Sequence, residues 1–558
     1  MSALGSALVA LLAALQAGAA RLERVETLQS ELPLGEQRLA DLDGDGRPEL
    51  LLVARDGRLE RRAPGPGRLL APAGALRLED PAHLLLDLGA FDAGRPGRQL
   101  LAATPRGLAL WSLGAEGEFE SEPRWLTSRA RMPFRSGEPR LAALAQDVNR
   151  DGRPDVVLPV LDACELWINE GPGEEPGHLP RLRRSARVAV EIDRWTSRGM
   201  RYLSSVLVSS FSVPNLATRD VDGDGRPDLL VEDGPRRSFY LQQADASFPD
   251  QPSVELDLSI FRDTGAEGGV RPGQTLSVVG EATYESRDLD GDSIPDYLIA
   301  HGRKVWVFLG SRQGPQFTDP LAILKTAEDV TALTPARLDE DPLPDLVIFK
   351  VQVPTVATLL RGLLGEWDVE IGAVGYRNEG GKGFESSPSW RSNVVVRLPS
   401  IVRLLKDPGE FLQRFEDVRS RFRTVVSGDL DGDGASDLAL ISPDNRRLDL
   451  WLSPAGESAS NVDADRALRE VVFESGDEVW DIDRILLWLG DLADRQVALQ
   501  TGGREASASA ELRADGRLRL AWVETGDLDG DGRAEILVGY RPPDGVGPST
   551  FDVLKLER

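Results

Sequence analysis

The chain has 558 residues, more than one ordinary hydrophobic core organises, so its length predicts several packing units or a repeat. Its formal net charge is -26, from 91 acidic and 65 basic residues. This charge argues against nucleic acid as a partner, because nucleic-acid binding needs basic patches. The single cysteine, Cys164, excludes an internal disulfide.

The first twenty residues carry no charged side chain. An apolar run at 8–15 and small residues at 17–19 are typical of a secretory signal with its cleavage site, although the usual basic start is missing. We therefore expect 1–20 to be a signal peptide and 21–558 to form a mature chain that is secreted, periplasmic or associated with the cell envelope. An uncleaved anchor and an apolar terminus of a cytosolic protein are the alternatives. No later stretch is long and apolar enough to predict a membrane span.

One pattern then recurs along the chain: a short strand, an acidic nine-residue loop, an apolar strand, a polar turn and a further strand. The apolar strands after the loops are expected at 50–53, 156–158, 229–231, 297–299, 346–348, 438–440 and 536–538. Several of the next strands carry an aromatic residue, as at 166–168, 238–240, 305–307 and 448–451. Short strands separated by turn residues predict antiparallel sheets.

The acidic loop has oxygen-bearing side chains at positions one, three, five and nine, and most copies have glycine at position six, which permits a sharp turn. The six copies are Asp41, Asp43, Asp45 and Glu49; Asp147, Asn149, Asp151 and Asp155; Asp220, Asp222, Asp224 and Asp228; Asp288, Asp290, Asp292 and Asp296; Asp429, Asp431, Asp433 and Asp437; and Asp527, Asp529, Asp531 and Glu535. One copy alone could be a polar turn. Converging carboxylates repel each other unless a cation lies between them, and hard oxygens without sulfur or imidazole favour Ca²⁺. We therefore expect about six Ca²⁺ sites.

Two further units depart from this pattern. The copy at 337–345 has Arg337 at its first position and Pro342 at its sixth, so we expect an ion pair within the loop in place of a metal. The turn at 91–98 has a single acid but precedes matching strands at 99–102 and 108–111, which predicts a unit without metal. Unit starts near 41, 90, 147, 220, 288, 337, 429 and 527 then predict about eight units, with seven left open. The apolar stretches at 485–489 and 496–501 are either further strands or a ninth, decayed unit.

The variable stretches predict two further features. Apolar residues at helical spacing on both sides of a Pro-Gly break predict a small helical insertion near 398–422. The last unit has only three strands, ending at 551–556, whereas 22–29 alternates like a strand without a sheet. Because proteins avoid unpaired edge strands, we expect 22–29 to pair with 551–556. The alternative is that 22–29 is a frayed leader.

The loops, their following strands, and the Asn-x-Gly and Gly-Phe pairs within 375–384 resemble the FG-GAP/VCBS repeats of integrin α-subunit-like propellers, which bacterial secreted proteins also carry. The resemblance covers nearly all of 22–558. It implies an all-β fold: a β-propeller of four-stranded antiparallel blades around a central axis. It also implies that the carbonyl of each seventh loop residue binds Ca²⁺, namely Arg47, Arg153, Arg226, Ile294, Ala435 and Arg533. Glu49 and Glu535 depart from the family pattern, and their longer arms predict shifted loops.

We expect the metal to stabilise the fold rather than to sense calcium or to catalyse a reaction. Four tryptophans at matching strand positions are expected to pack within blades: Trp111, Trp167, Trp306 and Trp451. Five others fall in stretches expected to be connections and are candidates for ligand binding: Trp125, Trp195, Trp367, Trp390 and Trp480. The chain shows no Ser-His-Asp, phosphate-loop or zinc signature. Two functions stay open: a non-enzymatic adhesion or scaffold module for an unknown protein or polysaccharide, and a calcium-dependent polysaccharide lyase or hydrolase.

Overall fold

A computed structural model describes most of the chain from Arg21 to Glu557. The described residues are 21–114, 116–132, 136–160, 163–172, 179–189, 192–198, 205–211, 215–261, 282–326, 329–337, 339, 341–351, 365–380, 383–398, 400, 425–442, 444–453, 479–481, 504–513, 517–543, 545 and 547–557. The predicted signal peptide, the possible ninth unit near 485–501 and nearly all of the predicted helical insertion lie outside these ranges. Among the described residues, no helix is long and apolar enough to cross a membrane.

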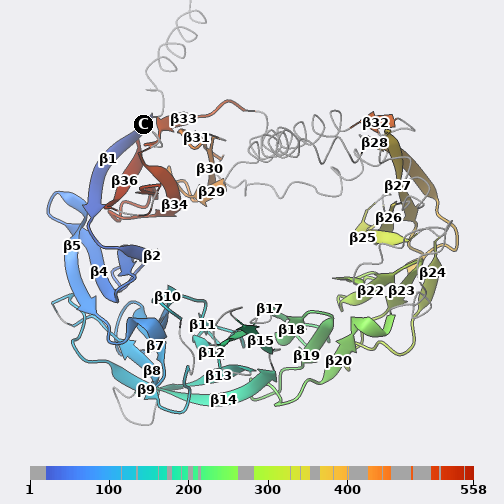
Figure 1. The fold of residues 1–558 in the computed structure, drawn as a ribbon, viewed down its shortest axis with the longest axis horizontal. Coiled ribbons are helices and arrows are strands. Elements are labelled where there is room, and N and C mark those ends of the chain that lie inside the picture. The colour runs from blue at the N-terminus through green and yellow to red at the C-terminus, as the bar shows by residue number, and fades with distance from the viewer. Residues whose placement is uncertain are drawn as a thin grey trace, which may run out of the picture.

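Eight blade-like sheets follow one another around a common centre (Figure 1). Six have four strands and two have five. In hydrogen-bonding order, sheet 1 contains β2 (Leu34–Ala40), β3 (Glu49–Ala54), β4 (Arg58–Gly65) and β5 (Arg68–Arg77); sheet 2 contains β10 (Arg140–Leu141), β6 (Leu85–Gly89), β7 (Gln99–Thr104), β8 (Gly107–Trp111) and β9 (Arg124–Thr127); sheet 3 contains β11 (Ala145–Gln146), β12 (Asp155–Pro159), β13 (Ala163–Pro172) and β14 (Pro180–Ala189); and sheet 4 contains β17 (Asn215–Arg219), β18 (Asp228–Asp233), β19 (Arg236–Tyr240) and β20 (Val254–Asp257).

The second half of the chain repeats this arrangement. Sheet 5 contains β21 (Thr283–Arg287), β22 (Asp296–His301), β23 (Lys304–Phe308) and β24 (Ala322–Lys325); sheet 6 contains β25 (Val330–Ala336), β26 (Asp345–Val351), β27 (Trp367–Tyr376), β28 (Trp390–Leu398) and β32 (Val479–Asp481); sheet 7 contains β29 (Val425–Gly428), β30 (Asp437–Ile441), β31 (Arg447–Trp451) and β33 (Ala508–Glu511); and sheet 8 contains β34 (Arg519–Gly526), β35 (Glu535–Arg541), β36 (Ser549–Glu557) and β1 (Arg21–Ser30). The first-named strand of each sheet lies toward the centre of Figure 1.

Three kinds of element besides the antiparallel part of the eight sheets complete the described fold. A separate hairpin pairs β15 (Ile192–Arg198) with β16 (Ser205–Phe211). The helical segments of the described part are the short turns η1 (Pro81–His83) and η2 (Leu258–Phe261). The fifth strands β10 and β32 pair in parallel with β6 and β28, whereas the other pairs are antiparallel. The prediction of an all-β fold of about eight blade-like units is confirmed, including the unit at 91–98.

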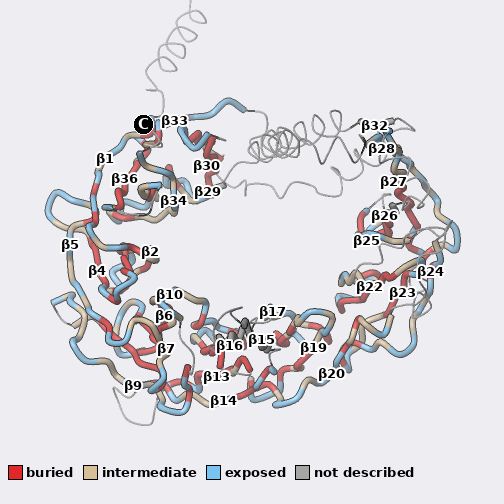
Figure 2. Tube along the Cα trace, viewed as in Figure 1, coloured by how far each residue is buried: buried red, intermediate tan, exposed pale blue. Residues whose placement is uncertain are grey.

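Hydrophobic cores lie between neighbouring sheets, as the buried positions in Figure 2 show. They arise because the strand after each loop is apolar at consecutive positions, and successive side chains of a strand point to opposite faces, so they contact both neighbouring sheets. Leu51 and Val53 of sheet 1 pack with Leu100 of sheet 2, and similar clusters join each successive pair from sheet 7 through sheets 8 and 1 to sheet 6. Among the described residues, sheets 6 and 7 share no such cluster. The buried core therefore runs continuously across the first and last sheets of the chain.

The first and last strands pair with each other, which confirms the prediction for 22–29. In β1, Leu22 lies opposite Leu556 of β36, and Leu28 lies opposite Phe551. Asp552 of β36 is fully buried beneath this pair. Its carboxylate accepts a hydrogen bond from Thr27 Oγ1 at 2.7 Å and forms ion pairs at 2.8 Å with Arg24 and Arg513. One buried carboxylate thus ties β1, β36 and the segment after β33 together.

The tryptophan predictions have mixed outcomes. Trp111 and Trp167 are buried between sheets, and Trp451 is buried against Leu438 and Leu440 of its own sheet. Trp306 is half-buried against the core of sheets 4 and 5, so all four pack as expected. The expectation that the other five lie in connections was wrong, because they belong to strands β9, β15, β27, β28 and β32. The side chain of Trp125 is 42 % exposed on the outer strand β9.

Candidate metal sites

Every loop is held to its sheet by the side chain at its ninth position, which begins the second strand of the unit. In Asp228, one carboxylate oxygen accepts the N–H of Val221 at 2.9 Å and the other accepts the N–H of Gln242 at 2.8 Å. Asp155, Asp296 and Asp437 make the same two bonds. The ninth acid therefore joins the start of the loop to the far end of the next strand.

The loop at 91–98 shows that this connection does not depend on a full set of acids. There Gln99 takes the ninth position, and its Oε1 accepts the N–H groups of Phe91 and Asp92 at 2.8 and 3.0 Å. Asp92, the single acid of that turn, is paired with Arg124 at 2.7 Å. A neutral side chain can thus hold the start of the turn, so this part of the ninth residue's role does not require a carboxylate.

The second loop residue is an apolar anchor that sequence reasoning missed. Leu42, Val148, Val221, Leu289, Leu430 and Leu528 are all buried in the cores between sheets. Its signal in the sequence is the Leu or Val between the first two ligand positions of every copy. With the ninth residue, this anchor holds the two ends of the loop while its acidic part faces outward.

Side chains at positions one, three and five fold the rest of each loop onto itself. Asp220 accepts the N–H groups of Gly223 and Gly225 at 2.7 and 2.8 Å. Asp222 accepts the N–H of Asp224 at 3.1 Å, and Asp224 accepts that of Arg226 at 2.8 Å. The corresponding bonds recur at Asp41, Asp147, Asp288, Asp429 and Asp527. These bonds orient the carboxylates before any ion binds.

The predicted carboxylates converge in five loops, where one oxygen from each of three acids lies within 4.8 Å of the others. These sets are Asp41, Asp43 and Asp45; Asp220, Asp222 and Asp228; Asp288, Asp290 and Asp296; Asp429, Asp431 and Asp433; and Asp527, Asp529 and Glu535. In the sixth loop, Asn149 supplies an amide at the third position and bonds to Asp151. All donors are hard oxygens, so the donor set fits Ca²⁺. The seventh-position carbonyl ligands stay a prediction.

Burial makes the ninth acids hard to ionise without a cation. It raises the pKa of Asp155 to about 7 and the pKa values of Asp228 and Asp296 to about 6, although backbone hydrogen bonds oppose the shift. The neighbouring loop acids add to it, because each further negative charge disfavours ionisation. A bound divalent cation would offset both effects.

These raised pKa values predict how the stability of calcium-free protein depends on pH. The folded state binds protons that the unfolded chain has already released near its ordinary pKa of 3.8, so stability is highest at low pH and falls as the pH rises through about 6 to 7. Melts of metal-stripped protein in metal-free buffer should therefore give a higher melting temperature at pH 5 than at pH 7.5. In Asp228→Asn the difference should shrink, and a melting temperature that rises over this interval would contradict the interpretation.

The damaged loop at 337–345 carries an ion pair, but it is not the internal pair that was predicted, because the basic partner comes from outside the loop. Asp339 at its third position lies 2.9 Å from Arg377, which follows β27. Asp345 keeps the architectural role, since its Oδ1 accepts the N–H of Asn378 at 2.9 Å. Arg377 therefore neutralises an acid that serves as a candidate ligand in the other loops.

The damaged loop allows a matched test of metal binding. Asp222→Asn and Asp431→Asn each remove a third-position carboxylate from a converging set, so each variant should bind about one Ca²⁺ fewer than the parent. Asp341→Asn alters the damaged loop and should leave the count unchanged. Metal analysis of the three purified variants checks this, and loss of an ion from Asp341→Asn would show that the damaged loop binds metal.

Neighbouring loops touch, so the candidate sites form a row at one end of the sheets. Gly223 at the fourth loop position has φ +72°, and a Cβ there would lie 2.8 Å from Cγ1 of Ile294 in the next loop. Gly530 has φ +76°, and its Cβ would lie 2.9 Å from Cδ of Arg47, which connects the last loop with the first. Glycine at this position therefore provides both the backbone conformation and the space for the next loop.

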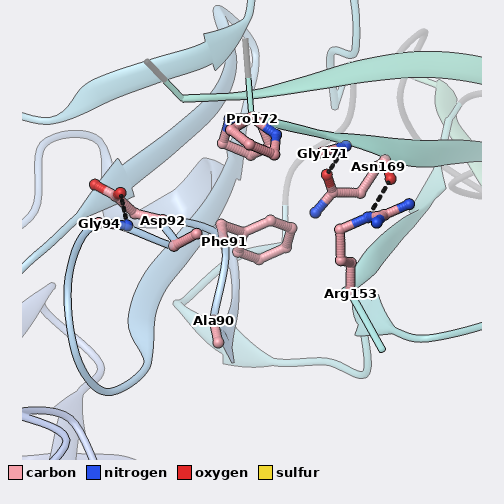
Figure 3. A pocket seen from close by; sticks show the side chains of 10 residues that line it. Ala90, Phe91, Asp92, Gly94, Arg153, Asn169, Gly171 and Pro172 are labelled. Atoms are coloured by element: carbon pink, nitrogen blue, oxygen red, sulfur yellow. Dashed lines mark hydrogen bonds between the residues drawn. The ribbon is translucent and has the colours of Figure 1, made fainter. Parts of the chain in front are cut away.

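A small cavity lies between the turn at 91–98 and the loop at 147–155 (Figure 3). Its volume is about 90 Å³, and Phe91, Asp92, Arg153 and Asn169 contribute to its wall. Arg153 donates from Nε to the carbonyl of Asn169 at 3.0 Å, and the Asn169 side chain accepts the N–H of Gly171. Ligand pockets usually hold about 300–1,000 Å³, so this cavity is too small for a typical organic ligand.

No family model matches the chain, and no curated protein matches it. Among solved structures, an Agrocybe aegerita lectin described as recognising non-reducing terminal N-acetylglucosamine shares 12% identity, over 66% of this chain and 93% of the lectin chain, with a TM-score of 0.25. BBS1N in complex with ARL6DN shares 10% identity, over 59% and 93% of the two chains, with a TM-score of 0.18. Likenesses at these TM-scores carry no argument about this chain.

Proposed function

We propose that this protein is a calcium-stabilised β-propeller of the FG-GAP/VCBS type that works outside the cytoplasm as a binding or adhesion scaffold for a protein or polysaccharide. The observation that supports it best is the row of loops in which carboxylate oxygens of the first and third positions converge with one from the fifth or the ninth position. Each loop is already folded by its own hydrogen bonds, and a cation would relieve the repulsion within it.

The proposed location follows from calcium chemistry. Extracellular calcium modules bind their ion with dissociation constants near 10⁻⁴–10⁻³ M, so they fill only where calcium is abundant. With Cys164 as its single cysteine, the chain has no disulfide framework, and metal ions would take the stabilising role that disulfides have in many secreted domains.

The scaffold role follows from how the loops are built. Their carboxylates accept backbone hydrogen bonds that hold each loop in shape. Trp125, in contrast, is exposed on an outer strand, where a ligand could stack on its ring. Under this proposal the metal shapes the sheets, and the ligand binds their outer or end surfaces.

A binding array tests the scaffold proposal directly. Calcium-loaded protein should bind a defined set of glycans or envelope proteins on the array, and chelated protein should lose that binding as its loops loosen. Trp125→Ala provides a test of the outer strand and should weaken binding without changing the metal count. Release of a cleaved sugar product from a bound polysaccharide would point to the enzyme alternative instead.

A further inference from the structure

Within the part of the chain that the structure describes, two of the six acidic loops contain a cation supplied by the protein. In the loop at 527–535, Lys555 of β36 lies 2.8 Å from Asp531 and 2.9 Å from Glu535 and also contacts Asp529. Its side chain is only 19% exposed. Three of the four acids expected to bind metal thus surround one ammonium group.

The loop at 41–49 has the same arrangement with a guanidinium group. Arg61 of β4 contacts Glu49 and lies 2.6 Å from Asp43. Its side chain is 4% exposed, and its Nη1 donates to the carbonyl of Gly117 at 2.8 Å, which holds it in place. This arginine is therefore buried between the third and ninth loop positions rather than lying on the surface.

The ninth residue explains why these two loops differ from the others. Where it is aspartate, as at Asp228, its two oxygens accept backbone N–H groups from the loop and from the end of the next strand. In Glu49 and Glu535 one oxygen keeps the bond to the loop, but the other faces Arg61 or Lys555. The longer side chain of glutamate thus reaches a cation on the neighbouring strand.

The aspartate loops have no basic residue at the place of Lys555. Continuing the strand register by one residue sets Lys555 opposite Glu535, and the same step sets apolar residues opposite the ninth aspartates: Ile168, Leu241, Leu309 and Leu452. Arg153 and Arg226 pair only with the fifth acid of their own loops, and both are 45% exposed. They leave the first, third and ninth positions of those loops to a metal.

We propose that Arg61 and Lys555 replace Ca²⁺ in the loops at 41–49 and 527–535, so that the chain binds four Ca²⁺ ions, in the loops beginning at Asp147, Asp220, Asp288 and Asp429. This inference rests on the proposed calcium function. A divalent ion among the same oxygens would lie beside a fixed positive charge and would have to displace it. The two loops without metal belong to sheets 8 and 1, where the first and last strands of the chain meet. That junction is therefore held by protein charges and does not open when calcium falls.

Equilibrium dialysis of the mature chain against radioactive Ca²⁺ at millimolar concentration tests the count. Four ions per chain are expected, falling to three in Asp222→Asn and Asp431→Asn and staying at four in Asp43→Asn and Asp529→Asn, which are matched third-position changes. Six ions per chain, or loss of one ion in Asp529→Asn, would overturn this inference and leave the proposed calcium function intact. Binding of no calcium would overturn both.

A gain-of-binding variant tests the cause. Lys555→Met removes the ammonium group but keeps an unbranched apolar side chain, so the freed acids should take up a fifth ion and the protein should gain thermal stability from added calcium. Circular dichroism establishes that the variant is folded. A folded Lys555→Met protein that still binds four ions would show that Lys555 is not what excludes the metal.

Discussion

Deleting residues 21–30 is expected to lower the melting temperature and to make the protein self-associate, because β1 is the outer strand of the sheet that ends with β36. Leu22 and Leu28 lose their buried positions, which removes about 4 kcal/mol at roughly 2 kcal/mol per leucine. Asp552 also loses Thr27 and Arg24. The hydrogen bond from Thr27 to this charged group contributes about 1.5–3 kcal/mol, and the ion pair with the solvent-exposed Arg24 adds less than about 1 kcal/mol. The expected loss is therefore about 6 kcal/mol.

The expected change in melting temperature depends on how much of the chain unfolds together. Unfolding entropy is about 2.1 cal/mol/K per residue, so for a chain of this length a loss of about 6 kcal/mol lowers the melting temperature by roughly 5 °C. The melting temperature falls further if sheet 8 unfolds separately, because a smaller unit has a smaller unfolding entropy and the same loss of free energy then shifts its melting temperature more. The deletion also exposes the edge of β36, which can pair with another molecule.

Calorimetry and light scattering measure the two effects. Arg21→Ala is the matched control, because it breaks only an exposed ion pair with Glu23 and should change stability by less than about 0.5 kcal/mol. A synthetic peptide of residues 21–30 should restore the melting temperature of the deleted protein and keep it monomeric. A deletion variant that melts like the parent and stays monomeric would rule out a stabilising role for β1.

The structural features that were predicted correctly are those that a short sequence pattern encodes repeatedly along the chain. The acidic loop and the apolar run after it recur often enough to place the second strand of every unit, and the same pattern revealed the unit at 91–98, where Gln99 stands in for an acid. The pairing of β1 with β36 was predictable because the last unit lacked a fourth strand, and the alternating segment at 22–29 lacked a sheet to join. The local hydrophobic pattern and the need to pair the edge strand of the last sheet were sufficient to predict these features.

The features that were missed depend on contacts between distant segments. Lys555 lies 20 residues after Glu535, and nothing in the loop itself indicates that an ammonium group will reach it. The pairing of β28 with β32 joins strands far apart in sequence, and the outer strands that carry Trp125 and Trp390 have too few alternating apolar residues to stand out. Outer strands are only partly buried, so selection for an apolar pattern is weak in them.

Removing calcium is expected to lower the melting temperature at neutral pH by about as much as deleting β1. At calcium concentrations about tenfold above the dissociation constant, each site contributes about 1.4 kcal/mol, so four sites contribute roughly 6 kcal/mol. This is comparable with the whole net stability of a typical domain, which is about 5–15 kcal/mol. Calcium should restore the melting temperature of chelated protein better than magnesium, because Mg²⁺ requires a smaller and more regular octahedral site.

Hydrogen exchange can show which strands calcium stabilises. It thus distinguishes stabilisation by calcium from stabilisation by the pairing of β1 with β36. In chelator, amides of β12, β18, β22 and β30 should exchange faster, since each of these strands begins with a ninth aspartate of a proposed calcium loop. Amides of β35, β36 and β1 should stay protected, because Lys555 and Asp552 hold that sheet without metal. A melting curve that excess chelator leaves unchanged would contradict calcium stabilisation altogether. Faster exchange in all eight sheets would instead show that calcium binding stabilises every sheet through the continuous cores. Sheets 8 and 1 would then also depend on calcium.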